Sequence, residues 1–322
     1  MATGIEPPSG RLRRLAEELD EIGLTFDLHS ADDRVVIDEI DYGLRPAIHE
    51  RRIPTYGSLV LPSADAAHWK AGTGLRITTR ALDKLALGDA RRFADGSSSW
   101  LVRRRDRGLQ LAVFDRPASS ERDIVVMVDA FQAAIVQRHS SGVVRLATER
   151  GVARWDGLAW HREPLVTRWI DAMAAWEGSA RERVFAKVLA FAVHDLGARG
   201  IGALLIVQNA DDETPNFEQR MAEPPPLDVG NPLDLTPLRH VLSQIDGAAV
   251  FDRNGVLRHL GVRLVASPEA VADVDGHRGM RHTSGRRYSF DQDGSVVIVV
   301  SEDGPVTVMK NGTILGRTDA QA

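Results

Sequence analysis

The sequence predicts a mixed α/β protein built from two domains. Its 322 residues exceed the length of one average domain. Helical apolar periodicity alternates along the chain with short apolar runs bounded by glycine, proline or asparagine, which are typical of strands. A break at Gly178-Ser179 separates an α+β half from a second half that contains longer apolar strands. We therefore expect an N-terminal domain over residues 1–175 and a C-terminal domain over residues 180–318.

The composition excludes several protein classes. The hydrophobic fraction of 43% and the charged fraction of 26% are ordinary for a globular protein. No apolar run approaches the roughly 20 residues that span a bilayer, and residues 1–10 lack the basic and apolar regions of a secretory signal. The absence of cysteine excludes disulfides, thiolate zinc sites and a cysteine nucleophile. We expect a cytoplasmic protein with no membrane partner.

The charge balance argues against nucleic acid as the main partner. The formal net charge is −5, whereas phosphate-backbone binding usually requires a basic domain. Arg103-Arg104-Arg105 is a local basic cluster. A solvated strand end explains this cluster better than a nucleic-acid site does.

The N-terminal half begins with an amphipathic helix expected at 11–29, where leucines recur at spacings of three and four until Gly23. The expected strands that follow are 35–40, 56–61, 75–79, 100–103, 109–114 and 124–128. Further helices are expected at 80–92, 129–139 and 167–177.

Residues 142–162 predict two strands or a three-stranded meander, because glycines punctuate an alternating pattern. Asp156-Gly157 is a favourable two-residue hairpin turn. Trp155 and Trp160 then stand on neighbouring strands, either as a ligand platform or as a packing pair. The packing pair is the favoured interpretation.

The C-terminal half opens with a helix at 181–196, which Gly197 and Gly200 end. A strand at 201–207 has no polar alternation and is expected to be buried. Residues 209–232 form a long proline-rich connection, either a functional flap or a mobile loop. A helix at 235–243 and strands at 248–251, 256–262, 296–300 and 306–310 follow, with Asn-Gly turns at 254–255 and 311–312.

Two polar motifs lie among these strands. Asp246-Gly247-Ala248 opens a strand, which places the carboxylate at the end of a sheet, where it suits a divalent-metal ligand or a base for a hydroxyl. Asp-Gly alone is more typical of a turn. The second motif is expected in a loop between Gly279 and Gly285 that leads into a helix or turn. Arg281 and His282 are candidate phosphate ligands.

Further polar groups accompany these motifs. Thr283 and Ser284 add hydroxyls to the second motif, and the two flanking glycines permit close backbone approach. Ser301, at the end of an apolar strand, is either a phosphate donor or a strand cap.

The order and spacing of these segments resemble the diadenylate cyclase (DAC) domain, the nucleotide-binding domain of the DNA-integrity scanning protein DisA and its relatives. The resemblance covers about residues 181–316. It is carried by Asp246-Gly247-Ala248, Gly279-Met280-Arg281-His282, the Val-Val-Ile-Val-Val-Ser-Glu-Asp-Gly run at 296–304, and the helix and strand at 186–207. It implies a central mixed sheet flanked by helices. The N-terminal half resembles no family known to us.

The resemblance implies an enzyme, a nucleotidyltransferase that condenses two ATP molecules into the second messenger cyclic di-AMP with Mg²⁺ or Mn²⁺. Two subunits of a homo-oligomer face each other, and each holds one ATP. Asp246 matches the aspartate that positions the metal and activates the hydroxyl, and Arg281 and His282 match triphosphate-binding residues. The nucleotide-contacting positions are Gly247, Ala248, Gly279, Met280, Thr283, Ser284, Ser301 and Glu302.

One position departs from the family pattern. The second arginine of the Arg-His-Arg motif is Thr283, and loss of a transition-state cation costs on the order of 10²-fold in rate. Arg286 or Arg287 is a candidate substitute. Three alternatives follow: a cyclase with a regulatory or assembly domain, a catalytically degenerate sensor of an adenine nucleotide, and an enzyme that makes a different nucleotide product.

Overall fold

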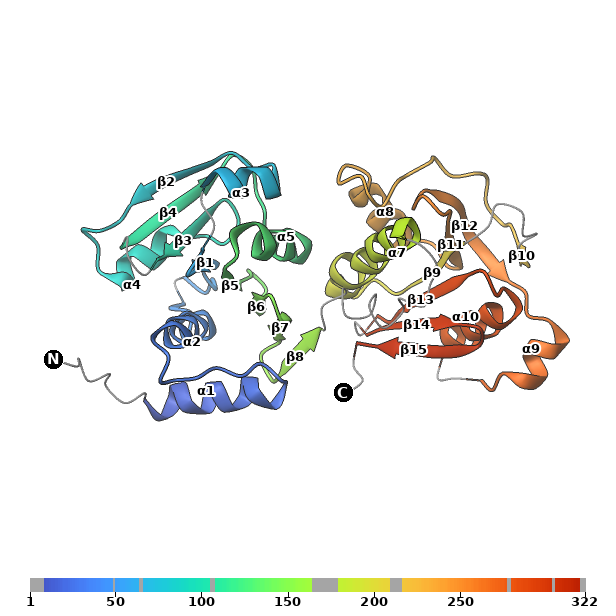
Figure 1. Cartoon of the computed structure of the whole chain (residues 1–322), viewed down its shortest axis with the longest axis horizontal. Helices are drawn as coiled ribbons and strands as arrows, with labels where there is room; N and C mark the ends of the chain where they lie inside the picture. The colour runs from blue at the N-terminus through green and yellow to red at the C-terminus, as the bar shows by residue number, and fades with distance from the viewer. Residues whose placement is uncertain are drawn as a thin grey trace. The chain divides into compact units, whose positions relative to one another are not determined.

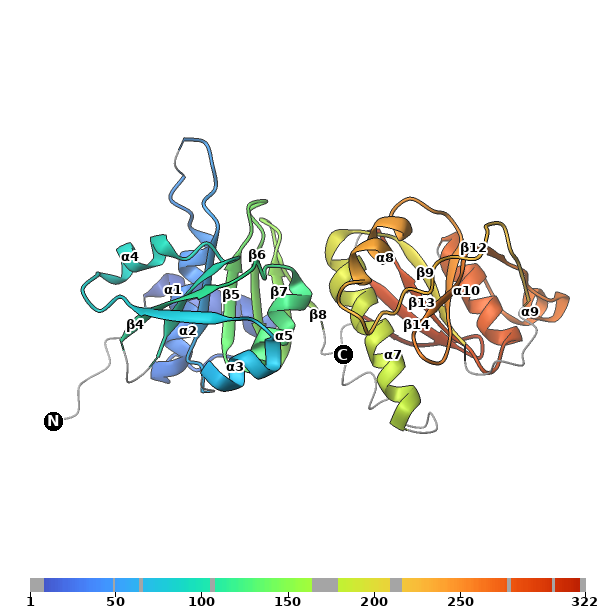
Figure 2. The same cartoon turned by 90° about the horizontal axis from the view of Figure 1, so that it is seen from above.

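The computed structural model describes residues 9–48, 50–63, 66–104, 108–163, 179–208, 216–276, 279–302 and 305–318. The chain forms two compact units, Met1–Leu165 and Val166–Ala322. Each unit is built on one mixed sheet with helices on both faces, so the chain has the mixed α/β fold that the sequence predicts (Figures 1 and 2). In the described ranges, no helix is long and apolar enough to cross a bilayer.

The first unit contains an eight-stranded sheet in the order β2-β4-β3-β1-β5-β6-β7-β8. β1 runs parallel to β3 and antiparallel to β5. The strands are β1 (Tyr56–Val60), β2 (Ile77–Ala81), β3 (Ser99–Arg103), β4 (Leu109–Phe114), β5 (Ala134–Arg138), β6 (Val144–Thr148), β7 (Gly151–Trp155) and β8 (Trp160–Glu163).

Helices cover both faces of this sheet. α1 (Gly10–Glu21) and α2 (Ala31–Leu44) pack on one face, and α3 (Ala66–Thr73) and α5 (Glu121–Phe131) pack on the other. Leu59 and Val60 are neighbours in β1 but pack in different cores, one on each face of the sheet. This follows because successive side chains of a strand point to opposite faces. A short helix, α4 (Leu87–Ala90), continues into a 3₁₀ turn at Arg91–Phe93.

Four expectations for this unit are wrong in whole or in part. The expected strand at 35–40 lies in α2, which Ser30 caps. The expected strand at 124–128 lies in α5, and most of the expected helix at 129–139 is strand β5. Short apolar runs do not distinguish a strand from a buried helix face, and here the Ser120–Asp123 capping box starts a helix. The expected helix at 80–92 is reduced to α4 and its 3₁₀ turn.

Of the two interpretations of residues 142–162, the three-stranded meander is confirmed, since β6, β7 and β8 pair in succession. Trp155 and Trp160 are register partners across the β7–β8 hairpin, with ring centroids 5.7 Å apart. Trp160 is buried in the core beneath α1 and α2, which favours the packing interpretation of the pair. The expected helix at 167–177 lies outside the described residues.

The second unit contains a seven-stranded sheet in the order β10-β12-β11-β9-β13-β14-β15. The central strand β9 runs parallel to β11 and antiparallel to β13. The strands are β9 (Ala203–Val207), β10 (Phe217–Glu218), β11 (Ala248–Phe251), β12 (Leu257–Leu264), β13 (Val296–Val300), β14 (Val306–Lys310) and β15 (Thr313–Arg317).

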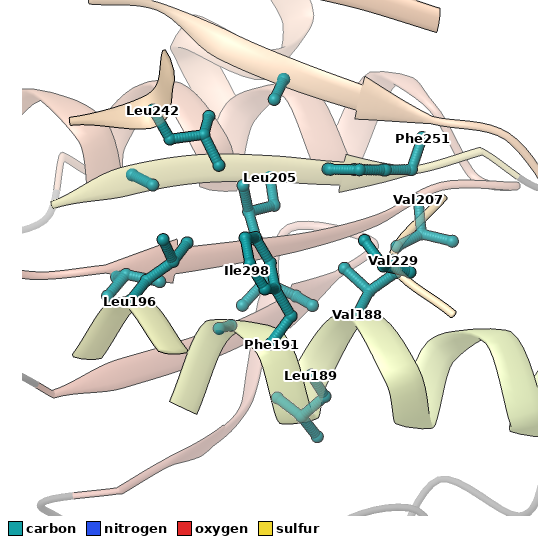
Figure 3. Packing of buried hydrophobic residues seen from close by; sticks show 14 of the residues in the cluster. Val188, Leu189, Phe191, Leu196, Leu205, Val207, Val229, Leu242, Phe251 and Ile298 are labelled. Carbon is teal, nitrogen blue, oxygen red and sulfur yellow. The ribbon is translucent and has the colours of Figure 1, made fainter. Parts of the chain in front are cut away.

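The helices of this unit also cover both faces of the sheet. α7 (Ser179–Phe191) continues through a π-helical turn at Ala192–Leu196 and a 3₁₀ turn at Gly197–Arg199. This segment and α8 (Leu235–Leu242) bury the core shown in Figure 3, where Phe191 and Val188 face Leu205 and Ile298 of the sheet. α10 (Met280–Asp291) packs on the opposite face, and α9 (Pro268–Asp273) precedes it.

The proline-rich connection is not wholly irregular. Residues 209–215 lie outside the described part, but β10 follows them as an edge strand, and Val229 is fully buried. Asp228 forms an isolated bridge with Val256. The later half of this connection is therefore packed onto the unit.

The register of the strands brings separate parts of the sequence together. Ala203 of β9 pairs with Val300 of β13, and Leu204 pairs with Ala248 of β11. The beginnings of β9 and β11 and the end of β13 thus lie at the same end of the sheet. We call this the site end.

Candidate functional site

Asp246 lies at the site end, two residues before β11. Gly247 has a φ of +103°, and a Cβ there would lie 2.7–2.9 Å from backbone atoms of Gly261 and Val262. Only glycine fits this close approach to β12 without strain. The turn leaves the Asp246 side chain fully exposed to solvent, at 103% relative accessibility.

Arg281 and His282 lie in the first turn of α10, not in a loop. The helix begins at Met280, after Gly279, whose φ is +87°. His282 Nε2 lies 3.3 Å from the hydroxyl of Thr307, which is buried in β14. Met280 is 86% exposed. The motif predicted to bind phosphate is therefore held by a helix start that packs against the sheet.

Arg281 joins the two predicted motifs. Its Nη2 lies 3.9 Å from Asp246 Oδ1, and its Nη1 donates to Glu302 Oε1 at 3.2 Å. Asp246 precedes β11, Arg281 starts α10 and Glu302 follows β13, so three distant segments meet. The structure thus brings these three predicted residues into one cluster at the site end.

Ser301 and Ser284 are the other predicted hydroxyl donors. Ser301 directly follows β13, and its backbone N–H donates to Pro305 O at 2.9 Å. Ser284 lies in the first half of α10 and is half-buried. Ser301 is therefore beside Glu302 at the site end, whereas Ser284 belongs to the helix.

Thr283 does not replace the missing arginine. Its hydroxyl donates to the Gly279 carbonyl oxygen at 3.2 Å, within the first turn of α10. The hydroxyl of Thr283 is thus turned to its own helix start. The position contributes no positive charge to the site end.

The expectation that Arg286 or Arg287 substitutes is wrong. Arg286 Nε donates to Gly312 O at 2.6 Å, and Arg287 Nε donates to Val274 O at 3.3 Å. Gly312 lies in the β14–β15 turn, at the opposite end of the sheet from Arg281. α10 runs along the sheet, so later residues of the helix point away from the site end.

Gly285 also has a role other than the predicted one. It lies inside α10, where a Cβ would lie 3.0 Å from Val297 Cγ1 and 3.1 Å from Leu204 Cδ1. The missing side chain lets the helix approach the sheet closely. Gly285 therefore supports helix packing and does not line a phosphate loop.

Gly202 is a site residue that the sequence analysis missed. A Cβ at this position would lie 2.4 Å from Arg281 Nη1 and 2.8 Å from Glu302 Cγ. The only available signal was its place in the Gly-Ile-Gly run that leads into β9. Nothing in that run indicates which side chains approach it.

A metal site built from protein ligands alone is absent from the described part of the chain, which holds no group of three or more His, Cys, Asp or Glu residues suited to a metal ion. Mg²⁺ bound with a nucleotide usually takes one or two carboxylates together with phosphate oxygens and water. The exposed carboxylate of Asp246 fits that arrangement as a single protein ligand.

The two units match two different family models. Residues 13–163 match the model described as "Probable sensor domain DACNK". Residues 190–314, which include every predicted site residue, match the model described as "DisA bacterial checkpoint controller nucleotide-binding". No curated protein matches the chain.

One solved structure similar to this chain is described as the crystal structure of a hypothetical membrane-spanning protein from Bacillus cereus. It is 22% identical, with a TM-score of 0.30, over 42% of this chain and 69% of that chain. The two family matches, in contrast, cover the two sheets almost completely. Residues 190–314 are therefore similar to the DisA nucleotide-binding (DAC) family, and residues 13–163 are similar to the DACNK sensor domain.

Proposed function

We propose that the second unit is a diadenylate cyclase that condenses two ATP molecules into cyclic di-AMP. Two copies of the unit face each other, and each holds one ATP. The 3′-hydroxyl oxygen of each ATP attacks the α-phosphorus of the other, pyrophosphate leaves, and the hydroxyl proton is released. Two such steps close the ring and give two pyrophosphates.

The observation that carries this proposal is the cluster at the site end. Asp246 and Arg281 are 35 positions apart in sequence, yet their charged groups lie 3.9 Å apart. A carboxylate beside a guanidinium supplies both a metal ligand and a phosphate ligand. Phosphoryl transfer depends mainly on such positioning and on charge neutralisation.

The roles of individual residues follow from this arrangement. Asp246 holds the divalent cation and orients the attacking hydroxyl, while Arg281 and His282 hold phosphate oxygens. Gly247 and Ala248 contact the nucleotide at the start of β11. Bound Mg²⁺ or Mn²⁺ supplies neutralisation of the phosphate charge. The DACNK unit regulates or assembles the cyclase unit.

A direct assay tests the proposal. The purified full chain is incubated with ATP and Mn²⁺, and the products are identified by mass spectrometry. We expect cyclic di-AMP and pyrophosphate from the wild type and none from Asp246→Asn, with both proteins folded by circular dichroism. Wild-type protein that makes no cyclic di-AMP, or a variant as active as the wild type, contradicts the proposal. A mixture of nucleoside triphosphates reveals any other product.

A second candidate function is nucleotide binding without turnover. It is favoured by Thr283, whose hydroxyl bonds to the Gly279 carbonyl, and by the remote positions of Arg286 and Arg287. Calorimetry with ATP separates the two functions. Saturable binding without product identifies a sensor, whereas binding with product identifies the cyclase.

A further inference from the structure

The guanidinium that is available for phosphate already has an anionic partner in the chain itself. Arg281 Nη1 donates to Glu302 Oε1 at 3.2 Å, and Nη2 lies 3.9 Å from Asp246 Oδ1. The Arg281 side chain is 39% exposed and that of Glu302 is 74% exposed. The carboxylates of Glu302 and Asp246 both lie near the terminal nitrogens of Arg281. The N–H groups of these nitrogens are the donors that bind phosphate oxygens.

The backbone before β9 leaves space for this ion pair. A Cβ on Gly202 would overlap both partners, at 2.4 Å from Arg281 Nη1 and 2.8 Å from Glu302 Cγ. A Cβ on Gly200, whose φ is +64°, would lie 2.9 Å from the Glu302 carbonyl oxygen. Two glycines thus accommodate Glu302 and its contact with Arg281. The backbone conformation at Gly200 and Gly202 therefore supports the ion pair between Arg281 and Glu302 independently of the distance between their charged groups.

We propose that Glu302 competes with nucleotide phosphate for Arg281 and so determines how tightly the site holds a triphosphate. This inference rests on the proposed function of the same site, and it gives Glu302 a role opposite to that of a nucleotide ligand. A phosphate that takes the Nη1 donor of Arg281 displaces the Glu302 carboxylate, because Glu302 accepts its hydrogen bond from that nitrogen.

The expected change in triphosphate affinity is small because the side chains of Arg281 and Glu302 are exposed to water. Exposed ion pairs contribute little because water screens them, so the competition costs about two- to fivefold in affinity. Replacing Glu302 by glutamine removes the charge and retains the shape of the side chain. Glu302→Gln is therefore expected to bind triphosphate about two- to fivefold more tightly than the wild type.

The experiment is calorimetry on the full chain with Mg²⁺ and 3′-deoxy-ATP, which carries the full triphosphate but lacks the attacking hydroxyl. Inorganic tripolyphosphate is a second probe that lacks the base and ribose. Asp293→Asn is the matched control, because it removes one exposed negative charge before β13, at the opposite end of the sheet. We expect tighter binding of both probes by Glu302→Gln and unchanged binding by Asp293→Asn.

A double-variant cycle shows whether the effect acts through Arg281. On an Arg281→Ala background, the gain from Glu302→Gln is expected to vanish. A gain that persists there identifies a general charge effect and overturns the competition. Unchanged or weaker binding by Glu302→Gln, with the wild type still binding 3′-deoxy-ATP, overturns this inference alone. Wild-type protein that binds neither probe overturns the proposed function and this inference together.

Discussion

At the scale of single residues, the first turn of α10 holds one cation where the family motif holds two. Arg281 reaches the site end, whereas the Thr283 hydroxyl bonds to the Gly279 carbonyl. Arg286 and Arg287 donate to backbone carbonyls elsewhere. Among these positions of α10, only Arg281 therefore brings a guanidinium to the carboxylates of Asp246 and Glu302 at the site end.

Restoring the second arginine tests whether this charge limits turnover. Thr283→Arg is expected to raise the rate of cyclic di-AMP formation by up to about 10²-fold, because a further cation stabilises charge that develops on the phosphates. The rate is measured with ATP and Mn²⁺ by mass spectrometry of the product. Thr283→Lys is the control, since it adds the charge without the bidentate geometry of arginine.

A Thr283→Arg variant no faster than the wild type would show that charge at this position does not limit the reaction. A rise of similar size in Thr283→Lys would assign the effect to charge alone.

At the scale of elements, α10 carries the motif that the sequence predicts to bind phosphate, and the absence of a side chain at Gly285 lets this helix lie close to the sheet. The three nearest heavy atoms to an added Cβ belong to Val297, Leu204 and Val299, which are all buried. β-branched side chains fixed in a sheet have little freedom to move aside. The distance between the helix and the sheet therefore depends on this glycine.

Gly285→Ala tests this packing. Alanine favours a helix over glycine by up to about 1 kcal/mol, but overpacking a core usually costs about 1–3 kcal/mol. We expect the overpacking to dominate, so that the second unit unfolds at a lower denaturant concentration and binds ATP more weakly. Denaturant unfolding and calorimetry measure the two effects. An alanine variant that is more stable than the wild type would contradict the close packing.

The β7–β8 hairpin contains a carboxylate that stabilises its own turn. Asp156 Oδ1 accepts hydrogen bonds from the N–H groups of Ala159 and Leu158, at 2.9 and 2.7 Å, and Oδ2 lies 2.8 Å from His161 Nε2. The backbone hydrogen bonds from Ala159 and Leu158, together with the side-chain hydrogen bond of His161, lower the pKa of Asp156 from 3.8 to about 2.

This lowered pKa predicts a pH dependence of stability. A depressed native pKa stabilises the fold fully above the unfolded pKa of about 3.9, and the stabilisation is lost as the pH falls towards 2. Asp156→Asn is therefore expected to lower the melting temperature of the first unit at pH 7, with the difference shrinking below about pH 4. Tryptophan fluorescence during heating measures it. A difference that stays constant down to pH 3 would contradict this account.

At the scale of the whole molecule, each unit has its own cores. The three buried clusters of the first unit contain residues up to Trp160, and the two clusters of the second begin at Phe185. Each unit therefore has its own source of hydrophobic stabilisation.

Two matched phenylalanine truncations test this independence. Phe131 packs against Trp69 at a ring distance of 4.9 Å in the first unit, and Phe191 is equally buried in the second. Phe131→Ala is expected to destabilise the first unit by about 3–5 kcal/mol through the cavity that it creates. Hydrogen exchange of β9 and β13 should stay unchanged, whereas Phe191→Ala should give the opposite pattern. Equal destabilisation of both units by either change would show coupled folding.

The sequence alone determined the second unit to a large extent. Glycines bound its first helix, and the uninterrupted apolar runs at 203–207 and 296–300 predict buried strands, because a glycine shortly precedes each run and the second run contains only valine and isoleucine. Asp246, Arg281, Glu302 and Ser301 were found from motif order. In the first unit, helices α2 and α5 were misassigned because short β-branched runs suit both a strand and a buried helix face.

Tertiary structure decided which of these groups meet. The pairing of β9 with β11 and β13 brings Asp246 and Glu302 to the site end, and the start of α10 adds Arg281 between them. The direction of α10 carries Arg286 away, and the space at Gly202 admits the Arg281–Glu302 pair. Residue types and their order are written in the sequence. Contacts between distant segments depend on strand register and helix direction, which arise only when the chain packs.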